Sequence, residues 1–176
     1  MNHSTAVCGT CLLLVLFGCS KEDKQDISQQ SNISNTSQSA QLDALGRSVV
    51  ARKCPDPISI ESEQVKNKHD PNITDEIRKI KCDGYTIQIY LANFIVPAKE
   101  LPMALTVYRK LDYIKPSQYI ASGPAEVIKA YGTPLQNQGN DIVYRLGTEE
   151  DFFYNYVTYK IKNGLVDEVT WDWDME

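Results

Sequence analysis

The sequence predicts an α+β domain: an antiparallel sheet of about six strands with one to three short helices on one face. Three observations lead to this class. Segments of alternating apolar and polar residues follow one another between turn sequences, Asp-Gly and Asn-Gly pairs join neighbouring segments, and helical spacing is confined to short stretches. Hydrophobic residues make up 42% of the 176 residues and charged residues 23%, so most of the chain can fold around a core.

The charge balance excludes one broad class of function. The chain has 18 Lys and Arg residues against 23 Asp and Glu residues, a formal net charge of -5. A general nucleic-acid binder neutralises phosphates with clustered cationic side chains, and no long basic run is present. We therefore expect no nucleic acid among the partners.

The N-terminus has the pattern of an export signal. Residues 1–18 contain no Lys, Arg, Asp or Glu, and the apolar stretch Ala6–Gly18 is too short to cross a bilayer as a helix. A signal-peptide core fits better. The stretch ends in Leu16-Phe17-Gly18-Cys19, which resembles the lipobox of bacterial lipoproteins.

This resemblance implies removal of residues 1–18 and acylation of Cys19. Several acyl chains on one cysteine would anchor the protein lastingly, at about 0.8 kcal/mol for each buried methylene. In such lipoproteins an Asp directly after the acylated cysteine keeps the protein at the inner membrane. Ser20 at this position therefore implies transport to the outer membrane, with the domain facing the periplasm. An ordinary cleaved signal or a buried helix is the alternative interpretation.

The segment after Cys19 is rich in Ser, Gln, Asn and charge, from Ser20 to about Gln41. It has too little apolar surface to offset its ordering entropy, so we expect a flexible tether. The chain then divides into a leader at 1–18, the lipidated cysteine and tether at 19–46, and a single α+β domain at 47–176.

The remaining cysteines form an even pair. Cys8 and Cys11 leave with the leader and Cys19 takes lipid, so Cys54 and Cys82 remain. In an oxidising compartment a disulfide is favoured, with two buried free thiols as the alternative. A metal site is not expected, because His69 is the one histidine after the leader and no third soft ligand lies near either cysteine.

Ile77–Leu91 is expected to form a β-hairpin. Asp83-Gly84 suits a two-residue type I′ turn, which needs positive φ at both positions. This register predicts one apolar face consisting of Ile80, Cys82, Tyr85, Ile87, Ile89 and Leu91. Alternation predicts a third strand near Leu105–Tyr113.

Start and stop signals predict one short helix. Pro124 lies near its first position, Glu126 in its first turn, Gly132 at its C-terminal cap and Pro134 beyond it. Further upstream, Leu42, Leu45 and Val49 have helical spacing, which allows a helix within Ala40–Lys53 despite Gly46. Residues 55–74 are ambiguous.

The C-terminal part predicts three more strands, at about 141–146, 152–162 and 165–174. A two-residue turn at Asn163-Gly164 would place Val157, Tyr159 and Ile161 on the opposite face from Val169, Trp171 and Trp173. A three-residue loop would place them all on one face, since a one-residue slip exchanges faces for a whole strand. We therefore predict the three-residue loop, pairing Ile161 with Leu165.

Gly123-Pro124-Ala125-Glu126-Val127-Ile128, Tyr131-Gly132-Thr133-Pro134 and the later Val157–Trp171 hairpin with Asn163-Gly164 form a recognisable series. It resembles the SmpA/OmlA, or BamE-like, lipoprotein domain, which is itself similar to the repeat of β-lactamase-inhibitor proteins. The resemblance covers only the C-terminal third, roughly 123–173. It implies a short helix that leads into a sheet closed by a hairpin.

No catalytic constellation stands out, so we expect neither an enzyme nor a small-molecule cofactor. His69 lies in a polar segment and is expected to be exposed, and no phosphate loop, nucleophile elbow or metal-ligand cluster appears. The favoured hypothesis is a non-catalytic adaptor that is held to the membrane through Cys19 and binds an envelope protein. Tyr154 and Tyr156, on the predicted outer face, are the candidate partner-binding residues, because tyrosines are enriched at interfaces. The alternatives are a periplasmic enzyme inhibitor and an envelope hydrolase with an unrecognised site.

Overall fold

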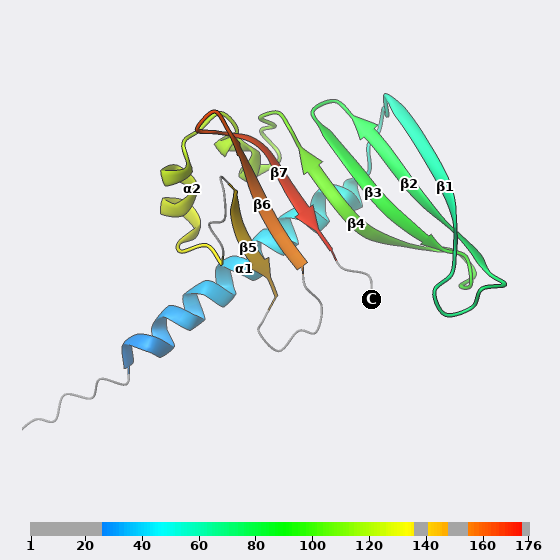
Figure 1. The fold of residues 1–176 in the computed structure, drawn as a ribbon, viewed down its shortest axis with the longest axis horizontal. Coiled ribbons are helices and arrows are strands. Elements are labelled where there is room, and N and C mark those ends of the chain that lie inside the picture. The colour runs from blue at the N-terminus through cyan, green and yellow to red at the C-terminus, as the bar shows by residue number, and fades with distance from the viewer. Residues whose placement is uncertain (1–25, 136–140, 148–154, 174–176) are drawn as a thin grey trace, which may run out of the picture.

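The structure, a computed structural model, describes residues 26–135, 141–147 and 155–173, with backbone alone for 26–37. Seven strands form one open antiparallel sheet in the order β1-β2-β3-β4-β7-β6-β5 (Figure 1). The elements are α1 Asp26–Arg52, β1 Ser59–Lys66, β2 Thr74–Cys82, β3 Tyr85–Ala92, β4 Lys99–Val107, the 3₁₀ helix η1 Lys115–Tyr119, α2 Pro124–Tyr131, β5 Ile142–Leu146, β6 Asn155–Lys162 and β7 Leu165–Asp172. Helix α1 passes behind the strands in Figure 1, and its buried residues share a core with one face of the sheet.

The predicted count of about six strands was wrong, because the sheet has seven. The missed strand is β1, which lies within the stretch 55–74 that the sequence left ambiguous. It pairs with β2 along its whole length, from Ser59 opposite Lys81 to Lys66 opposite Thr74. Most of its side chains are exposed, so it lacks the apolar alternation that identifies a half-buried strand.

The expectation of short helices fails at α1, which is 27 residues long and includes much of the segment expected to be a tether. Leu42, Gly46 and Val49 form its buried stripe, one turn apart. Once this part packs on the sheet, each residue added towards the N-terminus gains a backbone hydrogen bond without a new nucleation cost. Propagation from a packed segment accounts for helix in a polar sequence.

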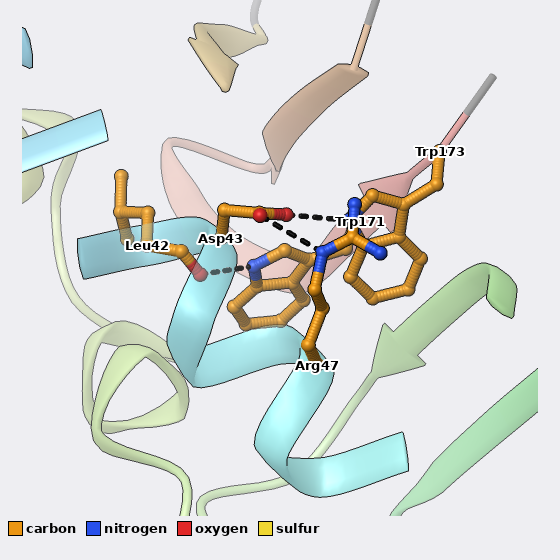
Figure 2. Close-up of polar contacts among 5 residues, drawn as sticks. All are labelled: Leu42, Asp43, Arg47, Trp171 and Trp173. Carbon is orange, nitrogen blue, oxygen red and sulfur yellow. Dashed lines mark hydrogen bonds and ion pairs between the residues drawn. The ribbon is translucent and has the colours of Figure 1, made fainter. Parts of the chain in front are cut away.

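Two tryptophans at the end of β7 hold α1 to the sheet (Figure 2). The Trp171 indole N–H donates to the carbonyl oxygen of Leu42 at 2.9 Å, and Trp171 is fully buried. The Trp173 indole N–H donates to Oδ1 of Asp43 at 2.7 Å. Arg47 bonds the same carboxylate at 2.8 Å and lies 5.4 Å from the centre of the Trp173 ring. The polar edge of each indole is therefore satisfied while its rings fill the core.

Gly46 allows this contact. A Cβ atom at this position would lie 2.5 Å from Cδ1 and 2.7 Å from Nε1 of Trp171. The helix therefore approaches the tryptophan through a position without a side chain, which explains the presence of a residue that ordinarily weakens helices.

The β2–β3 hairpin has the predicted register, with Cys82 opposite Tyr85 and Ile80 opposite Ile87. Its turn is not type I′, because Gly84 has φ of 87° while Asp83 is not among the residues with positive φ. The glycine alone supplies the left-handed position.

The third predicted strand is displaced: β4 covers Lys99–Val107 rather than 105–113. The register of β3 and β4 shifts between Gln88 and Ile89, so that Ile89 lies opposite Pro102 and Gln88 opposite Ala104. Proline is tolerated in a strand at such a bulge, where it need not donate a ladder hydrogen bond. Pro102 therefore lies within the strand, whereas the prediction began the strand only after it, at Leu105.

The predicted three-residue loop between β6 and β7 was wrong. Lys162 pairs with Leu165 across a two-residue turn in which Asn163 and Gly164 have φ of 54° and 78°. A register shift beyond Lys160 then brings Tyr159 opposite Val169 and Val157 opposite Trp171, so these residues still share the buried face. The bulge, rather than the loop, reconciles the turn chemistry with burial.

Helix α2 forms where predicted and packs through fully buried Val127. Next to it, rings of Tyr119, Tyr131, Tyr144 and Tyr159 meet with centroids 5.6 to 6.3 Å apart. Burial raises the pKa of Tyr144 to about 12. This aromatic cluster closes the β5–β6 end of the core.

We expect Gly46→Ala to destabilise the domain. Overpacking a core position costs about 1–3 kcal/mol, which exceeds the gain of roughly 1 kcal/mol for alanine over glycine in a helix. Urea unfolding should therefore show a lower midpoint. Gly123→Ala is the control, because a Cβ there meets nothing within 4 Å, and a change of less than about 0.5 kcal/mol is expected. Equal midpoints for wild type and Gly46→Ala would contradict the packing argument.

Candidate functional site

A cleft of about 470 Å³ opens between the C-terminal end of α1 and the face of β1–β4 that is turned towards this helix, the inner face of the sheet. Its lining is Arg47, Val50, Ala51, Lys53, Cys54, Pro57, Ile60, Arg78, Ile80, Ile87, Ile89, Glu100 and Pro102. The floor is apolar and the charged side chains belong to both walls. A concave apolar surface with a few polar groups is the usual form of a binding site.

The cleft exists because α1 ends before it covers the whole sheet. Leu42 and Val49, on the earlier turns of the helix, are buried against the core. Beyond the helix, Ile60 on β1 is 56% exposed and Ile58 just before it is 64% exposed. Large apolar side chains therefore face solvent at the open side of the cleft.

A disulfide between Cys54 and Cys82 closes one side of the cleft. Cys54 follows α1, and Cys82 is the buried last residue of β2. The bond joins positions 28 residues apart and keeps the segment after the helix against the end of the sheet. It therefore fixes the wall to which Pro57 belongs.

The cations around the cleft are paired. Nζ of Lys53 lies 3.1 Å from Oε2 of Glu100, and Arg78 donates to both carboxylate oxygens of Glu76 at 2.6 and 3.1 Å. This bidentate bond lowers the pKa of Glu76 and raises that of Arg78. Arg47 bonds Asp43, as described above. Since each of these cations has a carboxylate partner, the cleft suits an uncharged apolar group better than an anion.

A buried carboxylate organises the far end of the same strands. Asp75, at the second position of β2, is fully buried. It accepts hydrogen bonds from the Tyr90 hydroxyl, from the Asn67 amide at 2.7 Å and from the Asn93 backbone N–H at 2.8 Å. The bond from Tyr90 is the main cause that lowers the pKa of Asp75, against the opposing effect of burial. Burial and Asp75 together raise the pKa of Tyr90 to about 12.

This network ties together two loops. The Asn67 side-chain oxygen accepts the backbone N–H groups of His69 and Asp70, at 2.8 and 2.9 Å. The Asn93 amide donates to the carbonyl of Thr74 at 2.8 Å. The β1–β2 loop and the start of the β3–β4 loop are therefore held to one carboxylate.

The predicted partner-binding residues do not belong to the cleft. Tyr156, on β6, lies opposite Arg145 of β5 and Asp172 of β7, and it is half-buried on the face away from the helices. Tyr154 and Cys19, the predicted acylation site, lie outside the described residues. Tyr156 thus stays a candidate on the opposite face of the sheet.

His69 is exposed, and its side chain forms no part of the cleft. Within 26–135, 141–147 and 155–173, no three His, Cys, Asp or Glu side chains gather as a metal ion would require. In the same part of the chain, no helix combines the length and the hydropathy needed to cross a membrane.

Comparison of the chain with protein-family models, curated proteins and solved structures finds no match. The resemblance of 123–173 to the SmpA/OmlA family therefore stays a prediction.

Sequence reasoning missed both the cleft and the Asp75 network. The alternation of Ile58 and Ile60 was the one local sign of β1, and it is too short to define a strand. Asp75 lies just before the predicted hairpin Ile77–Leu91, and nothing in the sequence distinguishes it from an ordinary exposed polar residue. Its burial depends on loops that fold over it from two other places in the chain.

We expect Asp75→Asn to flatten the acid dependence of stability. Because the pKa of Asp75 is lower in the folded state, the unfolded chain takes up the proton first as pH falls. The stabilisation is therefore complete above the ordinary aspartate pKa of about 3.9 and is lost as pH falls below it. Urea unfolding at neutral and acid pH measures this difference.

In the Asp75→Asn variant an amide N–H group would also face the donors of Tyr90 and Asn67, so a lower midpoint at neutral pH is expected. Asp83→Asn is the control, since that carboxylate is 74% exposed and pairs with Arg109 at the surface. An acid dependence equal in wild type and Asp75→Asn would contradict the role of this carboxylate.

Proposed function

We propose that the chain is a lipoprotein of the bacterial envelope, held at the outer membrane through Cys19, whose periplasmic domain binds another protein without catalysing a reaction. The lipobox-like sequence up to Cys19 supports the anchor. The disulfide between Cys54 and Cys82 fits an oxidising compartment such as the periplasm.

The observation that supports protein binding best is the apolar cleft beside an edge strand. β1 is the first strand in the sheet order, so one of its edges has no neighbouring strand in the described sheet. An extended segment of a partner can add to such an edge through main-chain hydrogen bonds, while alternate side chains enter pockets. Ile60, on β1, lines the cleft and is 56% exposed.

The chemistry of the cleft defines the partner segment. The floor is formed by Ile80, Ile87 and Ile89, so it accepts an aliphatic or aromatic side chain. Glu61 and Glu63, on the other face of β1, are exposed and discourage indiscriminate pairing of this edge. The partner segment is therefore expected to be extended, with apolar residues at alternate positions.

A photo-crosslinking amino acid at Ile60 should give a defined protein adduct in intact cells. The same group at Glu61, the next residue on β1 but on the opposite face, is the matched control and should give much less of that adduct. Mass spectrometry identifies the captured protein.

Each outcome of the crosslinking separates two interpretations. The same crosslinking group at Tyr156 tests the outer face of the sheet. An adduct at Tyr156 without one at Ile60 would move the binding surface to that face. A captured enzyme whose activity rises on deletion of this chain would make the protein an inhibitor. The absence of an adduct at both Ile60 and Tyr156 would contradict the adaptor.

We expect Cys19→Ser to abolish both palmitate incorporation and partition into the membrane fraction. The reason is the loss of acyl chains, each worth about 0.8 kcal/mol for every buried methylene. Ser20→Asp is the matched control: it should retain the label but shift the protein towards the inner membrane. A Cys19→Ser protein that still partitions fully with membranes would contradict the anchor.

A further inference from the structure

An exposed apolar tip lies between β3 and β4. Residues 94–98 are Phe-Ile-Val-Pro-Ala, and the side chains of Phe94, Ile95 and Val96 are 56%, 37% and 94% exposed. Exposing such groups to water is unfavourable. A run of exposed apolar residues therefore points to a function of this tip.

The base of the tip is held in place. Asn93, the residue before Phe94, donates its backbone N–H to the buried carboxylate of Asp75 and its side-chain amide to the carbonyl of Thr74. Tyr90, near the end of β3, bonds the same carboxylate. These bonds fix the loop on its strands and present the apolar side chains outward.

The tip and the start of α1 both lie in the lower half of the view in Figure 1, at opposite ends of the longest axis of the molecule. The connection from β3 to β4 is at the lower right and the first residues of α1 are at the lower left, whereas the β2–β3 turn is at the upper edge. The chain from Cys19 to Asp26 spans at most about 25 Å, whatever its conformation. An anchor at Cys19 would therefore keep the start of α1 close to the membrane surface.

We propose that the apolar tip 94–98 inserts into the interfacial region of the membrane to which Cys19 is anchored. This inference rests on the proposed lipid anchor. The tip forms no part of the cleft lining, and its side chains are exposed, so they fit a soft apolar layer better than they could form a pocket for a ligand. Phe, Ile and Val all partition favourably into the membrane.

The contact does not depend on anionic lipids. The net charge of the chain is -5, and the tip itself has no charged residue. Lys99 follows it directly and is exposed, in position to reach lipid phosphates. The tip and the acyl chains would then form two separate attachments, which together hold a domain more firmly than one.

Tryptophan fluorescence tests the insertion in the acylated full-length protein bound to phosphatidylcholine vesicles. Phe94→Trp places a reporter at the tip. The natural Trp171 and Trp173 are 0% and 3% exposed and give a background out of reach of the lipid. Vesicles with brominated acyl chains should quench the added tryptophan at least twofold, with a shift of its emission to shorter wavelength.

Tyr113→Trp is the matched control. Tyr113 is 51% exposed and contacts Tyr85, the first residue of β3, so it lies at the opposite end of the strand from the tip. The tryptophan at this position should not be quenched. Adding Val96→Asp to Phe94→Trp should remove the quenching, and because Val96 is 94% exposed this change leaves the core intact.

Vesicle-bound protein in which Phe94→Trp is quenched no more than Tyr113→Trp would overturn the insertion while leaving the lipid anchor standing. Protein that fails to bind the vesicles at all would instead refute the anchor. A Phe94→Trp emission that shifts only when a partner protein is added would assign the tip to that protein and also overturn the proposal.

Discussion

The contact between Gly46 of α1 and Trp171 of β7 is the constraint on which the rest of the fold depends. The indole is fully buried, its N–H is satisfied by the carbonyl of Leu42, and a side chain at position 46 would collide with its ring. The contact fixes the distance of the helix from the sheet, and the bond from Trp173 to Asp43 fixes its rotation. Everything that follows α1 begins from a helix end placed in this way.

The position of that helix end decides where the sheet is covered and where it is open. α1 lies against β4 and β5 and leaves the inner face of β1–β3 partly uncovered. The disulfide then holds the segment after α1 at the end of β2. β1, which follows this segment, pairs with β2 at the edge of the sheet, next to the uncovered face. An apolar cleft beside an edge strand is thus a consequence of helix docking and one covalent bond.

Sequence patterns predicted the parts of the fold that local chemistry determines. Asp83-Gly84 between alternating segments was enough for the β2–β3 register, and Pro124 and Gly132 were enough for α2. The missing parts are non-local. β1 is recognisable only from its pairing with β2, and the polar start of α1 is helical because a later segment packs on the sheet. Of the candidate site, Cys54 and Cys82 could be paired by counting, whereas the cleft needs the relative position of helix and sheet.

The two proposed surfaces share β4. The strand begins at Lys99, directly after the tip, and its next residue, Glu100, pairs with Lys53 at the cleft. Asp75 fixes the tip at the other side of the same strands through Asn93. A tip fixed in the lipid interface would therefore hold the wall of the cleft at a constant height and tilt above the membrane. Because β1 pairs along its whole length with β2, the free edge offered to a partner would have the same fixed orientation.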